Sequence, residues 1–201
     1  MTVALLGLAL VAALALLYHA ATTPYIKLAT VATSAAAASS AQEKLGQITT
    51  AADQAHSTGR PVPVSVALSD AEMTSLAASA VSVAEQFGTL PAIDDVVVHA
   101  AGAGTIQVQA RLHFVFVTLP FYVAVHIASP DQKSIDVTVT DARLGTIPLP
   151  AGLVTGIVDQ VRRQLIDRIN VVQAPTYDHA GVIVGVGRVT FNATFEPART
   201  G

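Results

Sequence analysis

The residues of this chain that could take part in catalysis are few, and none stands in a recognised catalytic spacing. None of the motifs G-x-S-x-G, H-E-x-x-H or the Walker phosphate loop occurs in the 201 residues. There is no cysteine, which excludes thiolate zinc sites, disulfides and thiol nucleophiles. Gly102-Ala103-Gly104 begins like a dinucleotide fingerprint, but the third glycine is missing and a strand pattern follows where a helix is required. We therefore expect a turn at this position, no catalytic residue and no cofactor.

Three histidines on predicted strands, His99, His113 and His126, are the nearest approach to a metal-ligand set. Their spacing matches no known ligand pattern, so we expect ordinary half-exposed histidines and no metal site. The carboxylates that could form a pair for acid-base chemistry are Asp94, Asp95, Asp136 and Asp141. We expect them to be solvated residues of loops and strand faces. The chain is not expected to be an enzyme.

Charge and hydropathy point to a membrane instead of a nucleic acid. The net charge is −3 and only 12% of the residues are charged, which disfavours nucleic-acid binding. Residues 1–26 contain no Asp, Glu, Lys or Arg, and a helix of about 20 residues spans the roughly 30 Å of a hydrocarbon core. We expect residues 1–26 to be a transmembrane anchor, with a cleaved signal peptide as the alternative. Lys27 is the only nearby cation, so charge determines the orientation poorly.

Residues 27–60 are rich in Ala, Ser and Thr. Leu45, Ile48, Ala52 and Ala55 recur at helical spacing, which predicts a helical stalk or linker. Two interpretations remain open for this segment. Its stripe of small residues rests on the domain or on a second copy of itself, or the segment is a mobile spacer.

Residues 61–201 form one predicted domain with strands of period 2. Each strand has one apolar and one polar face, which is typical of an antiparallel sheet. The predicted strand segments are 62–68, 96–98, 106–116, 121–127, 135–139 and 189–195, with a break at Leu119-Pro120. A capping box of Ser69 and Glu72 starts one helix near Asp70, and an amphipathic helix follows Pro150. The order β-α-β-β-β-β-α-β predicts an α+β fold, with one sheet of about six strands packed around two helices.

Part of the predicted sheet is apolar on both faces, because Tyr122 and Ala124 lie opposite a Phe-rich face. Either this additional apolar surface lines a lipid-binding furrow, or the stalk or the curvature of the sheet covers it. The candidate lipid-binding residues are Phe114, Phe116, Phe121, Tyr122, Leu153, Ile157 and Val161. The candidate head-group residues are Arg162, Arg163 and Arg168, for which a solvated helix face with internal ion pairs is the alternative.

The segment Leu144-Gly145-Thr146-Ile147-Pro148-Leu149-Pro150, followed by an amphipathic helix, resembles the YpmS-like and LmeA-like envelope proteins of bacteria. The N-terminal apolar segment and the strand leading into Leu68-Ser69-Asp70-Ala71-Glu72 agree with this resemblance, which covers roughly residues 62–195. These families resemble the tubular lipid-binding fold, in which a strongly curved antiparallel sheet wraps around a long helix. The resemblance implies an extracytoplasmic domain that handles lipids or lipid-linked envelope precursors, and it defines no catalytic residue.

Taken together, the sequence predicts a single-pass membrane protein with its C-terminal domain on the extracytoplasmic side. Its expected partners are the membrane and a lipid or lipid-linked molecule, bound in an apolar groove without covalent chemistry. The alternative function is an envelope protein interaction or scaffolding module, in which the same apolar patch contacts a partner protein.

Overall fold

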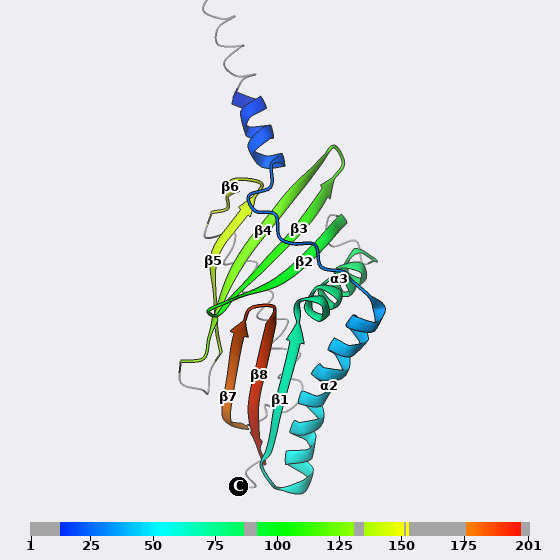
Figure 1. Ribbon diagram of the computed structural model, residues 1–201, viewed down its shortest axis with the longest axis vertical. Helices are drawn as coiled ribbons and strands as arrows, with labels where there is room; N and C mark the ends of the chain where they lie inside the picture. Colours follow the sequence, from blue (N-terminus) through cyan, green and yellow to red (C-terminus); the bar gives the residue numbers. More distant parts are fainter. Residues whose placement is uncertain (1–12, 87–91, 131–134, 151, 153–175, 198–201) are drawn as a thin grey trace, which may run out of the picture.

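The strands form two antiparallel sheets, shown in Figure 1. The computed structural model describes residues 13–86, 92–130, 135–150, 152 and 176–197. Sheet A has the order β1-β8-β7, with β1 (Val62–Ser69), β8 (Arg188–Glu196) and β7 (Thr176–Gly185). Sheet B has the order β2-β3-β4-β5-β6, with β2 (Ala92–Gly102), β3 (Thr105–Phe114), β4 (Val117–Ala128), β5 (Asp136–Leu144) and β6 (Ile147–Pro148). The predicted α+β class with antiparallel strands is confirmed.

The expectation of one sheet of about six strands is wrong. Within the described ranges the strands divide into sheets of three and five, and β6 and β7 were not predicted. The isolated bridge between Ala101 and Val186 connects the two sheets, and the N–H of Gly187 donates to the carbonyl of Ala100 at 2.8 Å beside it. The sheets therefore meet at the end of β2 and at the β7–β8 turn.

The outer edge of β2 is covered by α3 (Asp70–Gln86), which explains why the sheets stay separate. The hydroxyl of Thr74 donates to the carbonyl of Val98 at 3.1 Å and accepts from its N–H at 3.0 Å. The carboxylate of Asp70 accepts from the N–H of Ala100 at 2.9 Å. Because these side chains occupy the N–H and carbonyl of Val98 and the N–H of Ala100, pairing of this edge with sheet A is limited to the bridge at Ala101 and Val186.

The turn between β3 and β4 lies at Val115–Phe116, so the predicted break at Leu119-Pro120 is wrong. Strand β4 runs straight through Pro120, whose carbonyl accepts from the N–H of Gly145 at 2.6 Å. The N and O of one residue in an antiparallel strand point to the same edge. The nitrogen of Pro120 therefore faces the end of β5 and not β3, and no hydrogen bond between β3 and β4 is lost.

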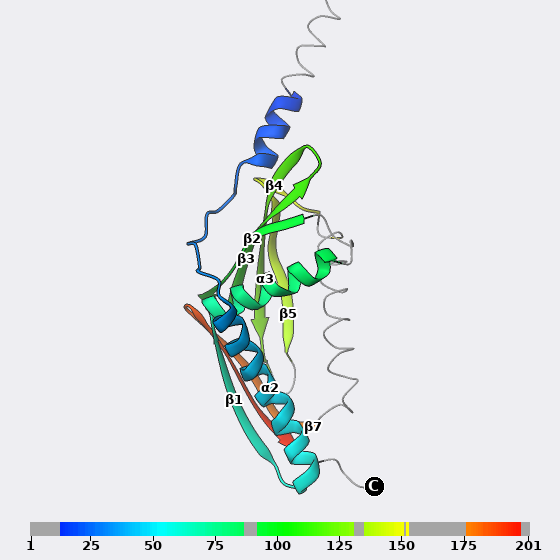
Figure 2. The same ribbon diagram turned by 90° about the vertical axis from the view of Figure 1, so that its right-hand side faces the viewer.

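Helix α2 (Ala35–Thr58) lies along sheet A. The side chain of Ser34 caps its start by accepting from the N–H of Ala37, and Gly59 ends it in the left-handed conformation. Figure 2 shows the helix packed lengthwise against β1. The core between helix and sheet consists of Ala51, Ala55, Ala193 and Phe195. The predicted stripe of small residues thus rests on the domain.

Helix α3 begins at Asp70 as predicted, directly after β1. The predicted capping box is confirmed: the N–H of Glu72 donates to the hydroxyl of Ser69 at 3.3 Å, and the N–H of Ser69 donates to the Glu72 carboxylate at 2.9 Å. Residues 87–91, which follow α3, lie outside the described part of the chain. So does all but residue 152 of the predicted helix after Pro150.

The N-terminal part consists of a helix over residues 13–22 and an extended segment over residues 23–34 that leads into α2. Figures 1 and 2 show this segment running across one face of sheet B. Within the residues that the structure describes, no helix combines the length and the hydropathy needed to cross a membrane. Residues 1–12 of the predicted anchor lie outside the described part of the chain.

Candidate functional site

The predicted lipid-binding residues lie at different places in sheet B. Phe114 ends β3, and Phe116 lies in the turn that follows. Phe121 and Tyr122 are neighbours on β4, so their side chains lie on opposite faces of the sheet. The structure therefore does not gather these four aromatic residues into one surface. The other predicted site residues, Leu153, Ile157, Val161, Arg162, Arg163 and Arg168, lie outside the described residues.

The face of sheet B that carries Phe121 is apolar across neighbouring strands; we call it the apolar face. Phe121 pairs with Ala110 on β3 and with Leu144 on β5, and Val123 pairs with Val108 and Ala142. Paired residues of adjacent strands share a face. Further members are Ile106, Leu112, Val125, Ile127 and Val139. Most of these side chains are only half-buried, although they come from the middle strands of the sheet.

The opposite face is covered by the extended N-terminal segment. The ring of Tyr25 packs edge-on against Tyr122 with centroids 5.5 Å apart, and the guanidinium of Arg143 lies 3.8 Å from the centre of the Tyr25 ring. The N–H of Leu28 donates to the side-chain carbonyl of Gln109 at 2.9 Å. Tyr122 is buried as a result, and burial raises the pKa of its hydroxyl, with a further contribution from Asp141.

One interpretation of the sequence was that the stalk, residues 27–60, or the curvature of the sheet covers the Tyr122 face; the structure places Leu28 of the stalk there, but the ring on Tyr122 is that of Tyr25, outside the predicted stalk. The covering residues are 23–34, which straddle the predicted boundary between residues 1–26 and 27–60. Tyr25 was not singled out from the sequence, although it is an aromatic side chain at the end of an aliphatic segment. Its position was the available signal: Tyr25 lies two residues before Lys27, the first charged residue of the chain. Tyrosine side chains, with an apolar ring and a polar hydroxyl, are common where apolar surroundings meet water.

Exposed apolar side chains gather at the turn between β3 and β4. Phe114 is 48% exposed, Val115 89% and Phe116 96%. We call these three residues the apolar tip. Val115 was not among the predicted site residues, and Phe116 was expected to lie on a strand face. The sequence signal was the unbroken run from Phe114 to Val117, in which no glycine, asparagine or aspartate marks the turn.

The N-terminal helix lies at the same end of the molecule as the apolar tip (Figures 1 and 2). Its exposed side chains include Leu14, Leu16, Leu17 and Tyr18. The carbonyl of Ala20 accepts from the N–H of Thr146 at 2.8 Å. The adjacent Gly145 has φ +60°, and a β-carbon there would collide with the carbonyl oxygens of Ala20 and Ala21. The Leu-Gly-Thr-Ile turn therefore holds the end of the helix against sheet B.

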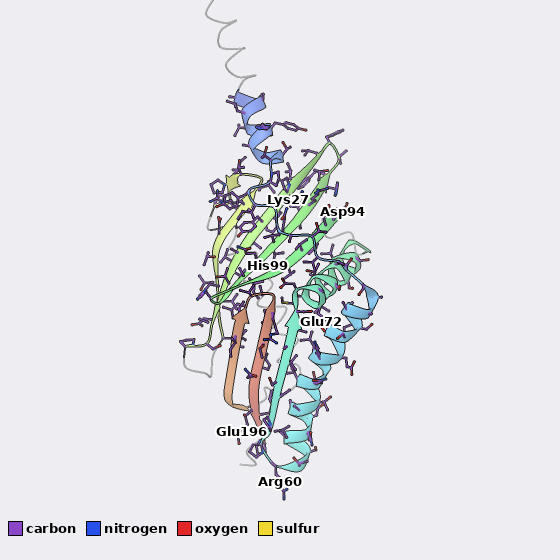
Figure 3. All side chains as sticks on the ribbon, in the orientation of Figure 1. Lys27, Arg60, Glu72, Asp94, His99 and Glu196 are labelled. Carbon is purple, nitrogen blue, oxygen red and sulfur yellow. The ribbon has the colours of Figure 1, made fainter. Side chains whose placement is uncertain are left out.

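Charged and polar side chains in close pairs follow the apolar tip along the sheet. The Nε2 of His113 lies 2.7 Å from the carboxylate of Asp94, and Arg111 lies 3.0 Å from Asp95. Figure 3 shows Asp94 near the tip end, whereas Arg60 and Glu196 lie at the far end of the molecule. The exposed apolar tip is thus followed by a charged band.

Two of the residues considered as candidate acids or metal ligands, His99 and Asp141, form close side-chain pairs. The Nδ1 of His99 lies 2.5 Å from the carboxylate of Asp70, which joins β2 to α3. The carboxylate of Asp141 lies 2.9 Å from Nε of Arg143 within β5. Across the described ranges, no three His, Asp or Glu side chains gather in a way that could hold a metal ion.

A polar cluster joins α2, α3 and β1, and the sequence did not predict it. The Nζ of Lys44 lies 2.6 Å from the carboxylate of the buried Glu72 and donates to the carbonyl of Ala67 at 2.9 Å. The hydroxyl of Ser40 donates to the same carboxylate at 2.6 Å. Burial raises the pKa of Glu72, but the hydrogen bonds from Lys44, Ser40 and Ser69 lower it by more, to about 2. The ionised carboxylate fastens the two helices together.

These contacts fix the positions of the N-terminal helix, the extended segment and α2 relative to sheet B. No protein-family model matches the chain, and no curated protein or solved structure matches it significantly, so the resemblance to the YpmS-like and LmeA-like proteins stays a prediction.

Proposed function

We propose that the protein is a membrane-tethered, extracytoplasmic domain that binds a lipid or lipid-linked envelope molecule on the apolar face of sheet B without catalysing a covalent reaction. The tether is argued from the charge-free residues 1–26. The extracytoplasmic location and the envelope ligand are argued from the resemblance to the YpmS-like and LmeA-like proteins.

One observation carries the lipid ligand: the apolar face extends over β3, β4 and β5, yet most of its side chains remain half-buried. Burial of an acyl chain contributes about 0.8 kcal/mol per methylene, so about a dozen methylenes contribute on the order of 10 kcal/mol before ordering costs. A ligand of this kind needs continuous apolar surface and no catalytic group.

The test uses the full chain, extracted from membranes in detergent, with the retained lipid measured by mass spectrometry per mole of protein. Val123→Asn places an amide in the middle of the apolar face, beside Val108 and Ala142. Ile183→Asn is the matched control, because Ile183 is 63% exposed on sheet A. Lipid held around the N-terminal segment is the same in both variants, so a difference between them reports the apolar face.

We expect Val123→Asn to lose most of the retained lipid and Ile183→Asn to keep it. Val123→Ile, which keeps the face apolar, shows whether a loss reflects polarity or misfolding, and thermal unfolding of all variants accompanies the measurement. Equal lipid in all variants, or wild-type protein that never retains lipid or takes up a fluorescent fatty acid, would overturn the proposal. A single protein adduct after crosslinking from the apolar face would replace it with the interaction module.

A further inference from the structure

The apolar tip exposes more apolar side chain than a soluble hairpin normally does. Val115 and Phe116 form a two-residue turn and are almost fully exposed. Turns of this length usually contain Gly, Asn or Asp. Burying one Val or Phe side chain contributes about 1.5–3 kcal/mol, so an environment that removes this tip from water stabilises it appreciably.

Backbone hydrogen bonds place the tip beside the N-terminal helix. Thr146 binds the carbonyl of Ala20, and the neighbouring Gly145 donates to the carbonyl of Pro120 at 2.6 Å. From Pro120 to Phe116, four residues of strand extend about 13 Å. From Ala20 to Leu14, six residues of helix extend about 9 Å. Both extend toward the same end of the molecule, and Figures 1 and 2 show the tip of the β3–β4 hairpin level with the end of the N-terminal helix that joins the extended segment.

The sequence beyond this helix indicates what covers the tip. Residues 1–12 contain no charged side chain and directly precede the exposed leucines of this helix in the sequence. The charged band of Asp94–His113 and Asp95–Arg111 lies a few residues from the tip along the strands. This order matches a membrane leaflet, in which the charged head groups lie outside the apolar acyl chains. A second copy of the chain is a poorer occupant, because a stable dimer needs about 800 Å² per partner and the tip has three residues.

We propose that the apolar tip inserts into the membrane leaflet in which the N-terminal segment is anchored. The domain then contacts the bilayer at two points, the N-terminal helix and the tip, and its orientation to the membrane is fixed. This inference rests on the membrane tether of the proposed function and is independent of lipid binding on the apolar face.

The experiment uses the absence of tryptophan from the chain. Phe116→Trp makes the tip the only source of tryptophan fluorescence in the full-length protein. The variant is reconstituted into phosphatidylcholine–phosphatidylglycerol vesicles, with and without brominated acyl chains, and vesicle association is checked by flotation. Val186→Trp is the matched control, because Val186 is 80% exposed and lies in the β7–β8 turn near the middle of the molecule (Figure 1).

We expect the tryptophan fluorescence of the Phe116→Trp variant to shift to shorter wavelength and to be quenched by the brominated chains, and the Val186→Trp variant to show neither effect. In Phe114→Trp, the added changes Val115→Ser and Phe116→Ser should abolish quenching while flotation persists. Vesicle-bound protein whose tip tryptophan stays unquenched overturns the insertion alone. Protein that does not float overturns the tether as well. Quenching without retained lipid on the apolar face leaves the insertion standing and removes the proposed ligand.

Discussion

The carbonyl of Ala20 accepts two hydrogen bonds from Thr146, one from its N–H at 2.8 Å and one from its hydroxyl at 3.0 Å. The end of the N-terminal helix is therefore held by the turn between β5 and β6. Through the neighbouring Gly145, which donates to Pro120, the same turn is connected to β4 and so to the apolar tip. The direction of the N-terminal helix and the position of the tip are set together.

Gly145→Ala should release the N-terminal helix from sheet B. An alanine costs about 1 kcal/mol in the left-handed conformation, and its β-carbon would also displace the carbonyl oxygens of Ala20 and Ala21. We expect a lower melting temperature and faster amide exchange at Thr146. Gly59→Ala is the control, because Gly59 has φ +63° but open space around it. Equal effects in the two variants would show that the close approach is unimportant.

Acid should weaken the connection between α2 and α3 through Glu72. Its pKa is lowered to about 2 in the folded protein, so its stabilisation is complete above about pH 4.3, the ordinary value, and is lost as the pH falls toward 2. We expect Glu72→Gln to lower the free energy of unfolding by about 2 kcal/mol at neutral pH. The difference from wild type should vanish near pH 2. Glu43→Gln, at an exposed position of α2, should change nothing.

Thr74→Val should destabilise the edge of sheet B. The side chain of Thr74 is fully buried, and its hydroxyl satisfies both the N–H and the carbonyl of Val98. Leaving both groups unpaired costs about 3 kcal/mol, which chemical denaturation would detect. Thr74→Ser keeps the hydroxyl and should recover most of the loss. Thr138→Val, at an exposed position of β5, should have little effect; a Thr74→Val variant as stable as wild type would contradict this account.

Tyr25→Ala should detach the extended segment from sheet B. It removes the ring that packs on Tyr122 and beneath Arg143, contacts that together contribute about 1–2 kcal/mol. We expect faster exchange of the Leu28 amide, which is bound to Gln109, and greater exposure of Tyr122. Tyr25→Phe keeps the ring and should behave like wild type. Unchanged exchange at Leu28 in Tyr25→Ala would show that the segment is held elsewhere.

The sequence by itself determined the local elements. Alternation predicted the strands around Val108, Val123 and Phe191, because period-2 patterning leaves one face for the core. The Ser69–Glu72 capping box predicted the start of α3, and Gly102–Gly104 predicted a turn, now seen between β2 and β3 with positive φ at all three residues. These features depend on residues close together in the chain.

The tertiary structure decided which elements pair and what covers each face. The edge of β2 is bound by Thr74 and Asp70 of α3, and Tyr122 is covered by Tyr25, 97 positions earlier in the numbering. Glu72 and Thr74 of α3 are polar but buried, because their hydrogen-bonding partners come from α2 and β2. Contacts between residues distant in sequence leave no local periodicity, so only the folded chain reveals them.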